Sequence, residues 1–177
     1  MFRTTRIRQF VLAAMMTAIF CILAPVSIPI GPVPITLATL ILPLLLYLRG
    51  TKWAIVSCVL YLLLGFFGLP VFSGFTGGVG VLLGPTGGFL LAYPLFLAVA
   101  GCFLSRGRFQ QTIGLGIGLL CCYVLGTVWY CIQTSASLES ALLICVLPFL
   151  PADAGKLAAA MFLGPVLQNR LQKAGLL

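Results

Sequence analysis

The sequence predicts an all-α integral membrane protein, with six transmembrane helices and two glycine- and proline-rich external loops that dip into the helix bundle. Three observations support this prediction: an apolar composition, six separate apolar segments, and a regular placement of the basic residues. Of the 177 residues, 62% are hydrophobic and only 7% are charged, which is too few charges to cover a water-facing surface. The length allows about six spans of roughly 20 residues each, in a single domain over residues 1–177.

The apolar segments predict helices at residues 8–24, 35–48, 53–67, 88–104, 112–133 and 152–168. The first segment follows a basic flank, as in a signal peptide, but no small-residue cleavage site comes after it, so we interpret it as a retained span. The last segment is preceded by an apolar approach that Pro148 and Pro151 interrupt.

Nine basic residues fall on one side of the membrane if all six segments span it. They stand before the first segment, in alternate connections, and after the last segment: Arg3, Arg6, Arg8, Arg49, Lys52, Arg106, Arg108, Arg170 and Lys173. The opposite loops, residues 25–34, 68–87 and 134–138, contain no Lys or Arg. Because an excess of Lys and Arg marks the cytoplasmic face, we expect a multi-pass protein of the cell membrane with both termini in the cytoplasm.

Two of the opposite loops are uncharged and rich in glycine and proline. Irregular backbone cannot face lipid, because its N–H and C=O groups would lack hydrogen-bond partners. We therefore expect residues 25–34 and 68–87 to be buried in protein or to line a cavity. The run GGVGVLLGPTGG lacks the G-K-[ST] ending and the leading strand of a phosphate-binding loop, so we expect this chain not to bind ATP.

Several functions are disfavoured by residues that the chain lacks. There is no histidine, and the seven cysteines lie in or beside apolar segments without a C-x-x-C spacing, so we expect no metal site and no cofactor. Without histidine or paired carboxylates, an enzyme is not expected. The net charge of +8 reports membrane topology and not nucleic-acid binding, because no basic stripe with interleaved aromatic residues is present.

The segment PADAGK places Asp153 and Lys156 together in an apolar stretch. The other acidic residue, Glu139, is interpreted as a solvated charge. A charge facing lipid costs about 2.5–3.5 kcal/mol, so we expect the pair, which shares one helix face at i and i+3, to face the bundle interior. Asp accepts and Lys donates hydrogen bonds, which suits a ligand with N–H donors beside a carbonyl, such as a cyclic urea. The alternative is a buried ion pair that locks the last helix in place.

Three motifs resemble the BioY family, the biotin-specific substrate-binding (S) components of energy-coupling factor (ECF) transporters. They are IPIGPVPIT at 28–36, GLPVFSGFTGGVGVLLGPTGG at 68–88 and LPFLPADAGK at 147–156. The resemblance covers essentially the whole chain. It implies a protein of the lipid bilayer that binds biotin, its transported ligand, from outside. It also implies partners: an ECF transmembrane coupling protein, and ATPase subunits that bind the ATP.

The resemblance further implies a set of site residues. Asp153 would accept a hydrogen bond from a ureido N–H of biotin, and Lys156 would donate to an oxygen. The other expected biotin-binding residues are Pro32, Thr36, Phe75, Gly77, Gly78, Thr86, Gly87, Gly88, Phe89 and Tyr93. Ala14 and Ala18 match the small-xxx-small motif with which S components dock the coupling protein, because small side chains allow close helix approach.

The chain departs from the family pattern at two places. Phe89 stands where the family usually has a tyrosine, and Tyr93, one turn later, is a candidate to supply the missing hydroxyl. Ala154 and Gly155 replace bulky aliphatic residues between the Asp and the Lys. Two alternatives stay open: an S component for another vitamin, such as riboflavin or thiamine, and a solitary biotin carrier.

Overall fold

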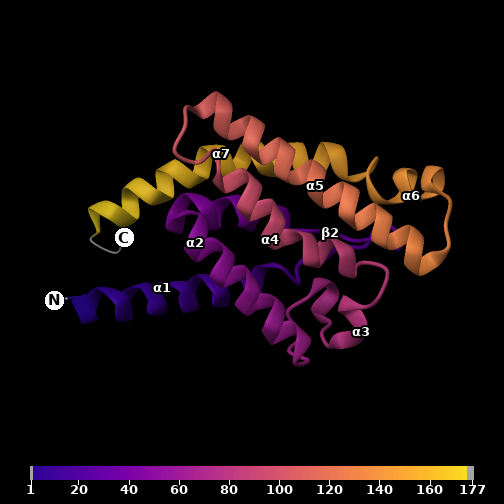
Figure 1. The fold of residues 1–177 in the computed structure, drawn as a ribbon, viewed down its shortest axis with the longest axis horizontal. Coiled ribbons are helices and arrows are strands. Elements are labelled where there is room, and N and C mark those ends of the chain that lie inside the picture. The colour runs from indigo at the N-terminus through magenta and orange to yellow at the C-terminus, as the bar shows by residue number, and fades with distance from the viewer. Residues whose placement is uncertain (1, 175–177) are drawn as a thin grey trace.

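The computed structural model describes residues 2–174, with side chains described from residue 7 onward. Within this range the chain is mostly helical, with one short hairpin (Figure 1). The elements in chain order are α1 (Phe2–Leu23), β1 (Ser27–Ile28), β2 (Ile35–Thr36), α2 (Ala38–Phe66), η1 (Ser73–Phe75), α3 (Val79–Leu82), α4 (Gly87–Gly101), α5 (Arg108–Thr134), α6 (Leu138–Cys145) and α7 (Phe149–Lys173).

Three helices among the described residues, α2, α5 and α7, are long and apolar enough to cross a membrane. Residues 7–23 of α1 and the whole of α4 form shorter apolar helices. Many large apolar side chains point outward, among them Phe67, Ile132 and Phe162, each more than 70% exposed. A water-soluble monomer rarely exposes so much apolar surface, so these faces suit contact with lipid.

The predicted helices at 35–48 and 53–67 are joined in the structure as one element, α2. The joint is a kink at Gly50, whose φ of 72° and ψ of 171° are not helical, and the two halves of α2 run in different directions (Figure 1). The backbone at this position lies in the left-handed half of φ space, which L-residues with a Cβ avoid. The break therefore falls inside the predicted gap, although helical hydrogen bonding continues to either side of it.

Replacing Gly50 with alanine is expected to lower the free energy of unfolding by about 1 kcal/mol. An added Cβ would meet no atom within 4 Å, so the cost comes from backbone strain alone. Thermal unfolding of the purified protein in detergent measures the effect. Gly116→Ala is the matched control, because Gly116 also has open space around it but no positive φ. Equal melting temperatures for the two variants would contradict the assignment of strain to Gly50.

The last predicted helix begins earlier and ends later than expected. We predicted residues 152–168, but α7 spans Phe149–Lys173. Pro151 does not interrupt it, because a proline in the first turn has no intrahelical N–H bond to lose. Pro165 lies inside α7. The apolar segment that precedes α7 forms a separate helix, α6.

The core lies where α2 packs against α1, α4 and α7, while α4 packs along α5. Three aromatic rings stack through it: Phe20 lies on Tyr61 with ring centroids 4.1 Å apart, and Phe72 meets Tyr61 edge-on at 5.5 Å. Between α1 and α2, the hydroxyl of Ser57 donates to the carbonyl of Ala13 at 3.1 Å. Small polar side chains of this kind hold apolar helices together where no water is available.

The two loops predicted to dip into the bundle contact each other and the core. The first forms the β1–β2 hairpin, in which Ser27 pairs with Thr36, and the N–H of Gly74 in the second donates to the carbonyl of Pro25 at 3.0 Å. Val33 and Phe72, one from each loop, are buried. The loops therefore contribute apolar side chains to the interior, while other side chains of the same loops are exposed.

The start of α1 and the end of α7 lie at the same end of the molecule, and α6 lies at the opposite end (Figure 1). Basic residues gather near the two termini. Arg49 is close enough to Arg8 for their charges to interact, and it lines the same cavity as Arg108. Arg8, Arg49 and Arg108, which lie in the described part of the chain, are therefore gathered at one end of the bundle, as the prediction requires.

Candidate ligand-binding site

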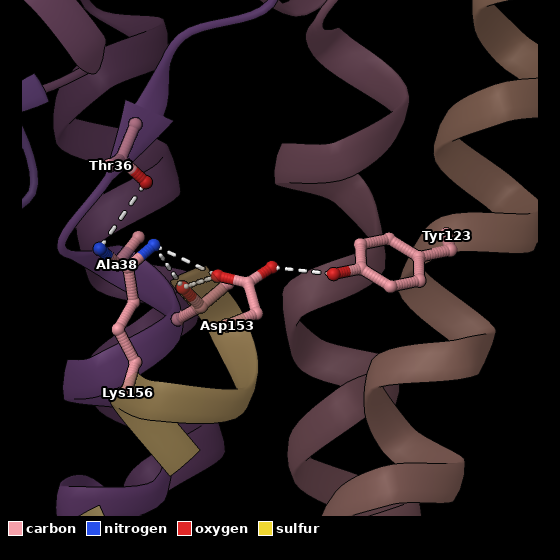
Figure 2. Close-up of polar contacts among 6 residues, drawn as sticks. Thr36, Ala38, Tyr123, Asp153 and Lys156 are labelled. Atoms are coloured by element: carbon pink, nitrogen blue, oxygen red, sulfur yellow. Dashed lines mark hydrogen bonds and ion pairs between the residues drawn. The ribbon is translucent and has the colours of Figure 1, made fainter. Parts of the chain in front are cut away.

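Asp153 is the centre of a polar cluster in the interior of the helix bundle. Its side chain is about 1% exposed, and three groups approach its carboxylate from two sides (Figure 2). The hydroxyl of Thr39 and the ammonium of Lys156 each lie 2.8 Å from Oδ1, and the hydroxyl of Tyr123 donates to Oδ2 at 2.8 Å. The cluster thereby joins α2, α5 and α7.

Asp153 and Lys156 share one face of α7, as their spacing predicts, and form an ion pair. The Lys156 ammonium also donates to the hydroxyl of Thr39 at 3.1 Å. The neighbouring Thr36 hydroxyl accepts from the N–H of Ala38 at 3.3 Å, at the start of α2 (Figure 2). Pairing within the interior offsets part of the cost of burying these two charges.

A count of hydrogen-bond capacity shows what the cluster has left for a ligand. An ammonium has three N–H donors, and Lys156 commits two of them. A carboxylate has about four acceptor positions, and Asp153 commits three of them. One donor on Lys156 and one acceptor position on Asp153 therefore remain. A ligand that carries an N–H next to a carbonyl oxygen would satisfy both.

The cluster lies in the wall of a cavity of about 250 Å³. The wall is mostly apolar, with a few polar groups, as is usual for small-molecule sites. The hairpin loop, η1, α3 and all the long helices except α1 contribute to it. The lining residues are Pro32, Val33, Pro34, Thr36, Thr39, Phe72, Ser73, Thr76, Val81, Thr86, Phe89, Leu90, Tyr93, Leu119, Cys122, Tyr123, Phe149, Asp153 and Lys156.

Seven of the residues predicted to bind the ligand line this cavity, although they come from distant parts of the sequence. They are Pro32, Thr36, Thr86, Phe89, Tyr93, Asp153 and Lys156. The structure also brings the two candidate hydroxyl positions together, since the ring of Phe89 and the buried Tyr93 both face the same space.

Phe75 and the four glycines predicted to contact the ligand do not line the cavity. Phe75 is 66% exposed and lines a separate surface hollow with Gly74. The N–H of Gly78 donates to the carbonyl of Gly65 at 2.7 Å, and so ties its loop to the end of α2. An added Cβ at Gly78 would meet no atom within 4 Å, so glycine is favoured here by the positive φ of 95° and not by a close contact.

The other three glycines fill tight packing positions. A Cβ on Gly87 would lie 1.8 Å from the carbonyl oxygen of Leu82, and a Cβ on Gly88 would lie 2.3 Å from the Cβ of Trp129. A Cβ on Gly77 would lie 2.2 Å from the backbone oxygen of Leu69. These glycines shape the cavity by letting α3, α4 and α5 come together beside it.

Sequence reasoning missed the two residues that hold the Asp153 carboxylate from α2 and α5. Thr39 and Tyr123 lie 114 and 30 positions away from Asp153. A buried hydroxyl needs a hydrogen-bond partner, but single hydroxyls are common in apolar helices and give only a weak signal. The sequence does not say that both hydroxyls meet the same carboxylate.

Ala14 and Ala18, predicted to dock a partner, lie away from the cavity on α1. Both are exposed, whereas Ala13 and Thr17 on the opposite face of the same turns are buried against α2. The small-residue face of α1 is thus presented outward from the bundle.

The model of the BioY family matches residues 1–173 of the chain. The chain belongs to the BioY family. The resemblance inferred from the three motifs is thereby confirmed.

Individual BioY proteins are similar to the chain over most of its length. The probable biotin transporter BioY of Pyrococcus horikoshii is 36% identical, with 92% of this chain and 97% of the relative covered. The biotin transporter BioY2 of Lactococcus lactis is 40% identical, with 83% of this chain and 82% of the relative covered. These names agree with the prediction of a transporter rather than an enzyme.

A solved structure supports the same relationship. The chain is similar to the S-component for biotin from an ECF-type ABC transporter, seen in a crystal structure at 2.1 Å. The TM-score is 0.84 and the sequence identity is 31%, with 98% of this chain and 95% of that chain covered. An all-α membrane fold of the S-component type is therefore confirmed for this member of the BioY family.

Proposed function

We propose that the chain is the biotin-binding S component of an ECF-type vitamin uptake transporter. The observation that carries this proposal is the Asp153–Lys156 pair in the wall of the cavity, with one acceptor and one donor uncommitted. The ureido group of biotin offers an N–H beside a carbonyl oxygen, which is the complementary arrangement. The names of the relatives support the same ligand.

In this proposal the ureido end of biotin lies against α7. Asp153 accepts from one ureido N–H, and Lys156 donates to the ureido oxygen. Thr39 and Tyr123 hold the carboxylate in place in the cavity wall. The apolar walls, including Phe72 and Phe89, surround the rest of the ligand. No cofactor takes part in this binding.

The proposed membrane arrangement is six spans in one domain, with both termini in the cytoplasm. The two halves of α2 on either side of Gly50 count as two spans, and α1, α4, α5 and α7 supply the others. Both termini lie at the same end of the molecule, which supports an even number of membrane crossings (Figure 1). The loops at 25–34 and 68–87 then lie on the external side, where they close over the cavity.

Uptake requires partners in this proposal, because the chain carries no ATP-binding loop. An ECF transmembrane coupling protein would dock on the outward face of α1 at Ala14 and Ala18, and ATPase subunits would supply the energy. Uptake of labelled biotin by cells expressing this chain, with and without those subunits, tests this. Equal uptake in both cases would instead favour a solitary carrier.

The choice of vitamin is tested by thermal stabilisation of the purified protein. We expect biotin to raise the melting temperature, whereas riboflavin and thiamine leave it unchanged, because the relatives and the S component that the chain resembles are named for biotin. Stabilisation by riboflavin or thiamine without stabilisation by biotin would reverse the assignment.

Replacing Tyr123 with phenylalanine is expected to weaken biotin binding about fivefold. The variant removes the hydroxyl that fixes Oδ2 of Asp153, and one hydrogen bond of this kind is worth about 1 kcal/mol. Isothermal titration measures the affinity. Tyr130→Phe is the matched control, because Tyr130 is buried on the same helix and does not line the cavity. Equal losses in both variants would remove Tyr123 from the proposed site.

A further inference from the structure

A second cavity, of about 390 Å³, lies at the kink of α2, at the end of the molecule where the chain termini lie. Three helices meet around it. Its polar lining consists of Tyr47 and Arg49 from α2, Arg108 and Gln111 from α5, and Gln168 from α7. This cavity shares no lining residue with the cavity at Asp153.

The two arginines in this lining have no carboxylate side chain near them. The chain has only two acidic residues. Asp153 is paired with Lys156 in the other cavity, and Glu139 lies in α6, at the opposite end of the molecule (Figure 1). The guanidinium groups at this cavity therefore lack a protein side chain of opposite charge.

Arg49 is also incompletely bonded. Its Nη2 donates to the side-chain and backbone oxygens of Gln9, which are neutral acceptors. Its Nε is buried, and it has no hydrogen-bond partner among the described residues. A buried donor without a partner costs about 1–3 kcal/mol, so a bound acceptor would be stabilised here.

Gln111 and Tyr47 in the lining are already paired with protein groups, so the two arginines and the start of α5 are left to attract an acceptor. The side chain of Gln111 is held in place, because its Nε2 donates to the carbonyls of Leu104 and Arg106, both at 2.9 Å. The hydroxyl of Tyr47 donates to Oε1 of Gln111 at 3.2 Å. Arg108 is the first residue of α5, and no side chain caps that helix end. Its free N–H groups add positive potential beside the guanidinium groups.

An apolar hollow of about 300 Å³ continues from this cavity along α7. The two share Tyr47, Arg108, Gln111 and Pro165, and the hollow adds Ala158, Met161 and Phe162. Phe162 is 73% exposed on the outer face of the bundle. A charged recess that opens into an apolar groove has the shape and chemistry of a phospholipid site, with a headgroup at one end and an acyl chain at the other.

We propose that this cavity binds a phosphate group, and that the phosphate belongs to an anionic phospholipid of the membrane. The guanidinium groups of Arg49 and Arg108 contact the phosphate oxygens, and one acyl chain lies along Met161 and Phe162. Arginine suits this role, because its planar fork of donors matches the geometry of phosphate. The proposal is independent of biotin, since none of these residues lines the first cavity.

Native mass spectrometry of the full-length protein, released from detergent with added lipid, tests the proposal. We expect phosphatidylglycerol to be retained about tenfold more than phosphatidylcholine, because the choline cation of the second lipid cancels the phosphate charge that attracts the two arginines. The preference should be lost in the double variant Arg49→Gln/Arg108→Gln. The control is Lys52→Gln/Arg106→Gln, which removes the same charge from two exposed residues that line neither cavity.

A second measurement separates the two possible sources of phosphate. Inorganic phosphate is added at constant ionic strength, and the melting temperature is compared with that in chloride. Protection of the wild type alone, without a preference for phosphatidylglycerol, would keep the site but assign it to free phosphate. If the double variant does not elute as a single folded species, Arg108→Gln alone is used, because Arg108 is exposed. The absence of both effects, or an equal loss in the control, would overturn the proposal.

Discussion

Asp153→Asn is expected to weaken biotin binding by at least about 100-fold. The substitution removes the charge that holds the ammonium of Lys156 and the acceptor offered to the ligand. It also places an amide N–H₂ where Tyr123 or Thr39 now donates. A hydrogen bond to a charged group contributes about 1.5–3 kcal/mol, and about 2.7 kcal/mol corresponds to 100-fold in affinity.

Glu139→Gln is the matched control for Asp153→Asn, because Glu139 is the other acidic residue and is exposed at the start of α6. We expect it to bind biotin as the wild type does. Titration calorimetry on both purified variants measures the affinities, and the melting temperature without ligand reports on folding. Unchanged affinity in folded Asp153→Asn would show that this carboxylate does not contact biotin.

Gly87→Ala is expected to destabilise the ligand-free protein by about 2 kcal/mol or more. The added Cβ would lie 1.8 Å from the carbonyl oxygen and 2.5 Å from the carbonyl carbon of Leu82. Because both are backbone atoms, α3 and α4 must move apart to make room. Thermal or denaturant unfolding in detergent measures the loss, with Gly116→Ala in open space as the control.

The same variant tests whether Gly87 is a packing residue or a biotin contact. If Gly87 is a packing residue, the variant protein should be less stable than the wild type before any biotin is added. If Gly87→Ala instead unfolded like the wild type and lost only biotin affinity, the glycine would be a ligand contact, as the family resemblance first implied.

The fold could be predicted largely because membrane helices leave long apolar segments and charged connections. All six predicted helical segments correspond to helical parts of the structure. The errors are at places where local chemistry competes with hydropathy. Pro151 was expected to interrupt the apolar approach before the last helix, but it lies in the first turn of α7, where no intrahelical N–H bond is lost. The β1–β2 hairpin was not predicted, because strands of two residues are too short to show an alternating pattern.

The site was predicted in part, for a different physical reason. Asp153 and Lys156 stand out because charges are rare and costly in apolar segments. Tyr123 and Thr39 do not stand out, because a single hydroxyl in an apolar helix is common and its partner is set by tertiary contacts. The predicted glycines do not line the cavity, because a glycine pattern indicates close approach without indicating which group approaches. At Gly87 and Gly88 the neighbours are Leu82 and Trp129.

The most direct test of the proposed binding mode compares biotin with two derivatives by titration calorimetry on the wild-type protein. One derivative is methylated at a ureido nitrogen, and the other is the methyl ester at the carboxylate end. If Asp153 and Lys156 hold the ureido group, ureido methylation should weaken binding at least about tenfold, since it removes a donor and adds bulk beside a buried charge. The ester should bind more tightly than the ureido derivative. Full affinity for the ureido-methylated compound would contradict the account.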